Sequence, residues 1–175
     1  FGVKQRSFLS KTLSPHTLTM SATPIPRSIS LTYFGNLDLS ILKSPPLKRL
    51  PVKTFLVPKN KTSDCYQWLL NDIKNRHTQA FIVCPFIEES ENLKTIRAAK
   101  TEFKKLETVF PKLKLALIHG KTKIDSRNKI LNDFQKNKIN ILVTTPIIEV
   151  GIDFPNATTI IIQSADHFGL SQLHQ

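Results

Sequence analysis

Long apolar runs are absent from this chain of 175 residues. The longest ones, Phe81–Cys84 and Thr158–Ile162, have the length of strands, far short of the roughly 20 residues that a membrane-spanning helix needs. The first residues, FGVKQRSFLSK, also lack the apolar core of a secretory signal. We therefore expect no membrane partner. Because the only methionine is Met20, we also expect the chain to be part of a longer protein.

Cysteine and glycine are scarce, with two and five residues respectively. Cys65 and Cys84 have no metal-ligand spacing, which predicts reduced thiols in or near a core, as in cytosolic proteins. No G-x-x-x-x-G-K-[ST] phosphate loop is present. The sequence also offers no Ser–His–Asp set, no cluster of metal ligands and no acidic cluster suited to Mg²⁺. We predict no metal site in these residues.

Positive charge is in excess, with 25 Lys and Arg against 13 Asp and Glu, a net charge of +12 and a pI of about 9.9. The electrostatic field of such a positively charged protein favours a polyanionic partner. The lysines are spread along the chain and do not form one basic arm. A generally basic surface without a nucleic-acid partner therefore remains the alternative interpretation.

Short apolar runs alternate with helical patterns along the chain. Strands are predicted at His16–Met20, Leu37–Leu42, Val52–Val57, Ala80–Cys84, Leu113–Ile118, Asn140–Thr144 and Thr158–Ile162. Helices are predicted at Thr62–Arg76, Glu89–Phe110 and Ile124–Lys136, each with an apolar stripe at helical spacing. The strands show little polar alternation, which is typical of strands buried on both faces. The order predicts an α/β fold with a parallel sheet and flanking helices.

The segment Ser44–Pro51 (SPPLKRLP) interrupts this order with three prolines. Proline fixes φ and removes a backbone donor, so the segment cannot join a regular ladder. We interpret residues 45–51 as a linker between one unit at 1–44 and a second at 52–175. A long surface loop within a single domain is the alternative.

Two strand ends carry hydroxyl residues before a turn. Ser21-Ala22-Thr23-Pro24-Ile25-Pro26-Arg27 follows the first predicted strand, and Thr144-Thr145-Pro146 follows the strand at Asn140–Thr144. Ligands of open α/β sheets collect at the carboxyl ends of the strands. Ser21 and Thr23 suit a relay of contacts at this edge, and Arg27 suits a contact with a phosphate, but a capped helix start explains them at least as well.

Residues after the second hydroxyl pair offer further groups. Thr144 and Thr145 can donate to a phosphate oxygen, and Gly151 permits a close backbone approach. Asp153 can accept a hydrogen bond from a ribose hydroxyl, or it can cap a turn before Pro155.

Two more strand ends complete this pattern. His119 and Gly120 end one strand, with Arg127 further along, and Cys84-Pro85 ends another. His119 alone is explained better as a histidine at the edge of the core. The carboxyl ends of parallel strands share one edge of the sheet, so we expect all four strand ends to converge there.

These segments, taken together, resemble the motifs of superfamily 2 helicases. SATPIPRS resembles motif III in the form shared by RecG and the transcription-repair coupling factor Mfd, and TTPIIEVGIDFPNATTIII resembles their motif V. ADHFGLSQLHQ resembles the stretch that runs into motif VI, and FGVKQR the stretch after motif II. FIVCPFIEESENL and FGNLDLSIL favour RecG, whereas PPLKRLPVKTF and ADHFGL favour Mfd. The resemblance favours RecG.

The resemblance implies a fold and a set of partners. Residues 1–44 would be the end of a first RecA-like lobe, whose remainder is a partner outside the chain, and residues 52–175 most of a second lobe. ATP and Mg²⁺ would be the cofactors of the whole protein, branched or duplex DNA its partner, and the bacterial cytoplasm its location. The phosphate loop, acidic box and arginine motif would lie outside the chain, so we expect no catalytic residue and no ATPase activity in this chain alone.

The resemblance also assigns residues to two sets. The nucleotide-binding or coupling set is Ser21, Ala22, Thr23, Arg27, Glu149, Gly151 and Asp153. The DNA-binding set is Cys84, Pro85, His119, Gly120, Arg127, Thr144 and Thr145. The chain departs from the usual motifs at Ser21, Pro146 and Phe154, and Pro146 removes one amide donor from the turn. A nucleic-acid-binding module without motor activity and a degenerate lobe kept as a scaffold are the alternative functions.

Overall fold

The computed structural model describes Ser40 and residues 51–84, 92–145 and 153–174. Apart from Ser40, these residues belong to one compact unit, Ser44–His174. The strands predicted at His16–Met20 and Leu37–Leu42 and the predicted linker lie outside the described residues, Ser40 and Pro51 excepted. The division of the chain into 1–44, 45–51 and 52–175 therefore stays a prediction.

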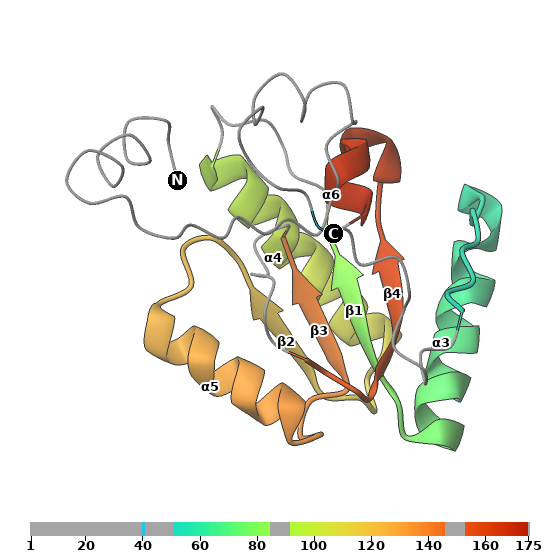
Figure 1. The fold of residues 1–175 in the computed structure, drawn as a ribbon, viewed down its shortest axis with the longest axis horizontal. Coiled ribbons are helices and arrows are strands. Elements are labelled where there is room, and N and C mark those ends of the chain that lie inside the picture. The colour runs from blue at the N-terminus through green and yellow to red at the C-terminus, as the bar shows by residue number, and fades with distance from the viewer. Residues whose placement is uncertain (1–39, 41–50, 85–91, 146–152, 175) are drawn as a thin grey trace. The chain divides into compact units, whose positions relative to one another are not determined.

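The described unit is built on one parallel sheet (Figure 1). Its strands are β1 (Gln79–Val83), β2 (Leu115–Ile118), β3 (Ile141–Thr144) and β4 (Ala157–Ile162). They lie in the order β2-β3-β1-β4, and every pairing is parallel. The parallel α/β fold predicted from the sequence is confirmed, and these four strands agree with their predicted positions to within two residues.

Three long helices connect and cover these strands. They are α3 (Thr62–Arg76), α4 (Asn92–Val109) and α5 (Ile124–Gln135), as predicted to within a few residues. Short elements are the 3₁₀ turns η1 (Lys59–Lys61) and η3 (Ala165–His167) and the helix α6 (Leu170–His174), none of which was predicted. Helix α4 joins β1 to β2 and helix α5 joins β2 to β3, which is the kind of connection that parallel strands need.

One face of the sheet is covered by α3 and α4. Leu69 of α3 and Leu106 of α4 are fully buried against Ile82 of β1 and Val143 of β3. The opposite face is covered by α5, whose Phe134 packs with Phe81 and Phe154 in three edge-to-face ring pairs. Both faces of β3 are therefore buried, which explains why its sequence, ILVT, shows no polar alternation.

The strand predicted at Val52–Val57 is wrong. Residues 51–58 have no regular secondary structure, and Leu56 is 96% exposed and Phe55 77% exposed. A strand is stabilised by hydrogen bonds to a neighbouring strand and by burial of its side chains. No described strand pairs with these residues, so the apolar pattern alone does not make a strand here.

Gln79 joins the beginning of β1 to the connection that precedes β3. Its side-chain amide is buried and donates to the carbonyls of Phe134 and Ile139, both at 2.6 Å. Asn140 Oδ1 accepts from the Lys114 N–H at 2.9 Å, which ties the start of β2 to the same connection. These polar contacts fix the amino edge of the sheet and with it the register of the strands.

His77 ends α3 in the left-handed region, with φ 52° and ψ 34°. Glycine is preferred at such a position, because a Cβ atom crowds the backbone there. We expect His77→Gly to raise the free energy of unfolding by about 0.5–1 kcal/mol. Urea unfolding of the chain measures this change.

Asn75→Gly is the control, since Asn75 lies inside the right-handed last turn of the same helix. There glycine should lower the free energy of unfolding by about 0.5–1 kcal/mol. Equal effects of the two substitutions would contradict the assignment of strain to His77.

Candidate functional site

The carboxyl ends of the strands form one row of polar and small residues. Register pairs place Ile118, Thr144, Val83 and Ile162 side by side across β2, β3, β1 and β4. The residues that follow are His119, Thr145, Cys84 and Gln163. Hydrogen bonds continue across them: Thr145 N–H donates to the Ile118 carbonyl at 3.3 Å, and Cys84 N–H donates to the Thr144 carbonyl at 2.8 Å. The predicted convergence is confirmed for the three predicted strand ends that the structure describes.

His119 forms a closed turn at the end of β2. Its N–H donates to Thr122 Oγ1 at 2.9 Å, and its Nδ1 accepts from the Lys121 N–H at 3.3 Å. Burial and the nearby charge of Lys100 lower the pKa of His119 below its ordinary value. The imidazole is therefore neutral at pH 7, which leaves Nε2 as the protonated nitrogen that can donate to a ligand.

Helix α5 begins directly after this turn, so its first amides lie at the same edge. Its N-cap, Lys123, makes no side-chain hydrogen bond to the helix, and the first N–H groups of a helix have no partner within it. Gly120, Lys121 and Lys123 are exposed beside it, and Arg127 lies in the first part of α5. Unsatisfied amides and basic side chains together favour an anion.

The two threonines of the row are buried in the described structure. Thr144 and Thr145 are each 1% exposed. The Thr144 hydroxyl donates to the Thr145 carbonyl at 2.6 Å, whereas Thr145 Oγ1 has no hydrogen-bond partner. Neither hydroxyl is presented to solvent, so their contact with DNA stays a prediction.

The side chain of Cys84 is also poorly suited to contact a ligand. Its thiol is buried, and burial together with the charge of Glu102 raises its pKa to about 12. Its N–H is bonded to the Thr144 carbonyl. Both cysteines are free thiols, as predicted.

Gln163 is a residue of the row that the sequence analysis missed. Its N–H donates to the Val83 carbonyl at 3.0 Å. Its side-chain amide donates to Tyr66 Oη of α3 at 3.0 Å and to Glu102 Oε1 of α4 at 2.9 Å. Gln163 therefore holds the end of β4 against both helices on that face. A polar residue directly after an apolar strand was the signal used for the other three strand ends, and it applies here too.

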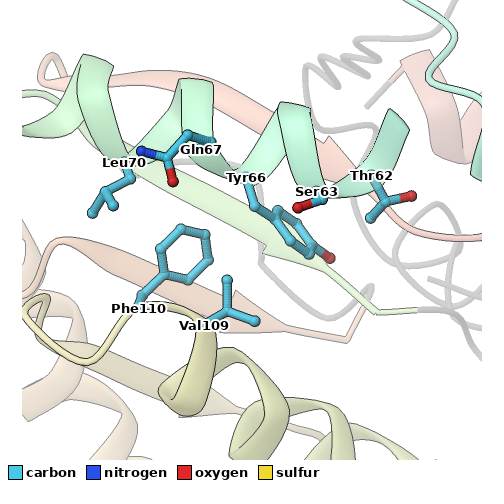
Figure 2. Close-up of a pocket in the computed structure, with 7 residues that line it drawn as sticks. All are labelled: Thr62, Ser63, Tyr66, Gln67, Leu70, Val109 and Phe110. Carbon is cyan, nitrogen blue, oxygen red and sulfur yellow. The ribbon is translucent and has the colours of Figure 1, made fainter. Parts of the chain in front are cut away.

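Tyr66 also lines a pocket between α3 and the end of α4 (Figure 2). Its ring meets that of Phe110 edge to face, with centroids 5.5 Å apart. The lining residues are Thr62, Ser63, Tyr66, Gln67, Leu70, Val109 and Phe110. None of them belongs to the predicted site.

The structure describes only one residue of the predicted nucleotide-binding set. Asp153 is exposed and precedes Phe154, which packs on the α5 side of the sheet. The other members, Ser21, Ala22, Thr23, Arg27, Glu149 and Gly151, lie outside the described residues, as does Pro85 of the DNA-binding set. The structure therefore brings together His119, Gly120, Arg127, Thr144, Thr145 and Cys84, at or beside one edge, and Asp153 apart from their row.

Within the described ranges, no group of three or more His, Cys, Asp and Glu side chains could hold a metal ion. Among the same residues, no helix combines the length and the apolar character that crossing a membrane requires.

A family model described as the helicase conserved C-terminal domain matches residues 60–175. The chain belongs to this family. The match takes in all the described strands and the whole polar row. The helicase C-terminal domain is thus the unit that the parallel sheet and its three long helices form.

The relatives of this helicase C-terminal domain include ATP-dependent DNA helicases named RecG. The chain is 41% identical over its whole length to the one from Thermotoga maritima and 43% identical to the one from Streptococcus pneumoniae. It covers 22% and 26% of these two proteins, so it spans about a quarter of their length. The resemblance to RecG inferred from the motifs is confirmed.

The chain is also similar, at lower identity, to a solved structure. Domain 2 of the DEAD-box helicase Mss116p, solved with an RNA duplex, has a TM-score of 0.45 and 24% identity. The matched region covers 59% of this chain and 38% of that one.

The contact between Gln163 and Glu102 can be tested by exchanging the two groups. Gln163→Glu places a second carboxylate where an amide donated to Glu102. Two adjacent carboxylates raise each other's pKa, so the folded state binds protons more readily than the unfolded state. The stability of the variant should therefore fall as the pH rises above about 4.3, the ordinary pKa of Glu.

We expect a loss of about 1–3 kcal/mol at pH 8 in urea unfolding, and a smaller loss at pH 5. Glu102→Gln in the same chain restores a donor and an acceptor, so Gln163→Glu/Glu102→Gln should recover most of the stability at pH 8. If the double variant is as unstable as Gln163→Glu, the amide–carboxylate contact is not what stabilises this end of β4.

Proposed function

We propose that the chain is the coupling part of an ATP-dependent DNA helicase of the RecG type. In this proposal the whole protein uses ATP hydrolysis to move on DNA and remodels branched DNA in recombination and repair. The observation that carries it is the row of His119, Thr145, Cys84 and Gln163 at one edge of the sheet. The similarity of the whole chain to RecG proteins supports it.

DNA would meet this edge at the turn after β2 and the start of α5. The ammonium groups of Lys121 and Lys123 are exposed there, and Lys100 lies close enough to lower the pKa of His119. Helix α5 adds its first amides, which have no partner within the helix and no bond to the side chain of the N-cap residue Lys123. Contacts of this kind bind the phosphate backbone and carry no sequence information, as translocation along any DNA sequence requires.

ATP would act through residues of both predicted units. Bound ATP supplies the free energy for movement, and Asp153 would accept a hydrogen bond from its ribose. The exposed carboxylate of Asp153 suits that role. Ser21, Ala22, Thr23, Arg27, Glu149 and Gly151 would complete the set, in an arrangement of residues 1–44 as the end of a first lobe and 52–175 as the second. Mg²⁺ would be held by residues outside this chain.

Two alternatives from other classes lead to different expectations. A nucleic-acid-binding module without motor activity would have no phosphate loop encoded upstream of Phe1, whereas a RecG-type helicase would. A scaffold lobe would bind DNA no better than its net charge of +12 accounts for. The RecG relatives favour a RecG-type protein over an Mfd-type one. A location in the bacterial cytoplasm fits this function and the two free thiols.

Binding of DNA at the carboxyl edge can be tested by removing two positive charges at a time. We expect Lys121→Gln/Lys123→Gln to weaken binding of the chain to duplex DNA about tenfold at ~50 mM salt, and to reduce the salt dependence of log K by about two. Fluorescence anisotropy across a salt series measures both quantities. Lys112→Gln/Lys114→Gln removes the same charge next to the start of β2, at the opposite edge. Equal losses from the two pairs would favour a general effect of net charge over an interface.

The chain alone should not hydrolyse ATP. Phosphoryl transfer depends on positioning of the phosphates and neutralisation of their charge, and the sequence has no phosphate loop to do this. We expect phosphate release with ATP, Mg²⁺ and DNA to equal the background without protein. DNA-stimulated turnover that persists through purification would contradict the assignment of these residues to coupling.

A further inference from the structure

The pocket between α3 and the end of α4 has no part in the proposed function (Figure 2). Its volume is about 450 Å³, the size of a site that takes a small ligand or a few side chains. Leu70, Val109 and Phe110 give it an apolar lining. Val109 is 44% exposed although its side chain is apolar. Apolar surface that opens to solvent in this way marks a place where another molecule binds.

The wall of this pocket is held in place without a ligand. Tyr66 Oη accepts a hydrogen bond from the Gln163 side chain at 3.0 Å, and the Tyr66 ring meets the Phe110 ring edge to face. Phe110 is 1% exposed, and its N–H donates to the Leu106 carbonyl at 2.8 Å. A binding partner would therefore spend little free energy on ordering this surface.

Three exposed lysines adjoin the pocket. Lys61 precedes the lining residue Thr62, and Lys74 follows the lining residue Leu70 by one helical turn, so it lies on the same side of α3. Lys112 comes shortly after the end of α4. The pocket thus combines an apolar lining with positive charge beside it.

Acidic side chains of the same two helices do not offset this charge. Asp64 and Glu107 each lie two positions from a lining residue, Tyr66 or Val109, and residues two apart in a helix do not face each other. Glu102 is already engaged, by the Lys105 ammonium group and by the side chain that fixes Tyr66. Negative charge on a partner would complement the three lysines.

We propose that this pocket binds an acidic segment of another protein, which inserts a phenylalanine or leucine side chain between α3 and α4. Burial of that side chain against the apolar lining supplies most of the affinity. Carboxylates on either side of it meet the lysines, which favours acidic segments over neutral ones and speeds their association. The inference does not rest on the proposed function, because none of the lining residues belongs to the polar row.

A labelled peptide of aspartate and glutamate with one phenylalanine at its centre is the probe. We expect fluorescence anisotropy to show binding to the 175-residue chain, and an affinity about tenfold lower when alanine replaces the phenylalanine. Asparagine and glutamine in place of the acids should weaken binding and remove most of its salt dependence.

Two substitutions change the pocket itself. Val109→Asp adds a carboxylate to the lining, and Ser63→Trp fills the pocket from an exposed position of α3. Each should lower the affinity for the phenylalanine peptide about tenfold. Urea unfolding shows whether each variant is folded, and Ser63→Trp decides the matter if Val109→Asp is not.

The lysines provide a matched pair of variants. Lys61→Gln/Lys74→Gln should weaken peptide binding about threefold at ~50 mM salt, and less at high salt. Lys121→Gln/Lys123→Gln removes the same charge at the carboxyl edge and should weaken binding less. If the carboxyl-edge pair weakens binding more, the peptide binds at that edge and the inference is overturned.

Three further outcomes would overturn the inference. The first is no binding by the unsubstituted chain, or equal binding by a folded Ser63→Trp variant. The second is displacement of the probe by a peptide with the sequence of residues 51–58, whose Phe55 and Leu56 are exposed, since the chain's own segment would then fill the pocket. The third is a dimer that Ser63→Trp dissociates, since a second copy would then fill it. Failure of the chain to bind DNA would count against the proposed function alone.

Discussion

Parallel pairing of β1, β3, β2 and β4 is the constraint on which the rest of this domain depends. Parallel strands cannot be joined by tight turns, so each connection has to cross back along the sheet, and α4 and α5 are the crossings from β1 to β2 and from β2 to β3. The same pairing sends every strand toward one edge. Residues up to 97 positions apart, Tyr66 and Gln163, come into contact as a result. The site is therefore a product of topology more than of any local sequence motif.

The sequence predicts the core elements well where an apolar pattern and a packing partner coincide. Leu69 and Ile73 of α3 and Ala99 and Leu106 of α4 are apolar residues at helical spacing, and all four are buried. Val52–Val57 has an equally apolar sequence but no described strand beside it, and Phe55 and Leu56 are exposed. Local composition cannot distinguish these cases, because a strand is stabilised mainly by its neighbours.

The candidate site could be predicted in position but not in detail. A hydroxyl or polar residue directly after a buried strand indicates the edge where ligands bind, and this rule located His119, Thr145 and Cys84. It could not indicate that Thr145 Oγ1 lacks a partner or that Gln163 bridges Tyr66 and Glu102. Such facts depend on distances between side chains from different elements, which no sequence pattern contains. The relation to RecG proteins was readable because motif order is a property of the sequence itself.

The direction of the helices distinguishes the two edges of the sheet. α3, α4 and α5 each lead into a strand from its amino end, so their own amino termini all face the carboxyl edge. Each helix adds a partial positive charge to that edge and a partial negative charge to the other. The helix amino termini therefore add to the positive charge of the exposed Lys121 and Lys123 at the carboxyl edge.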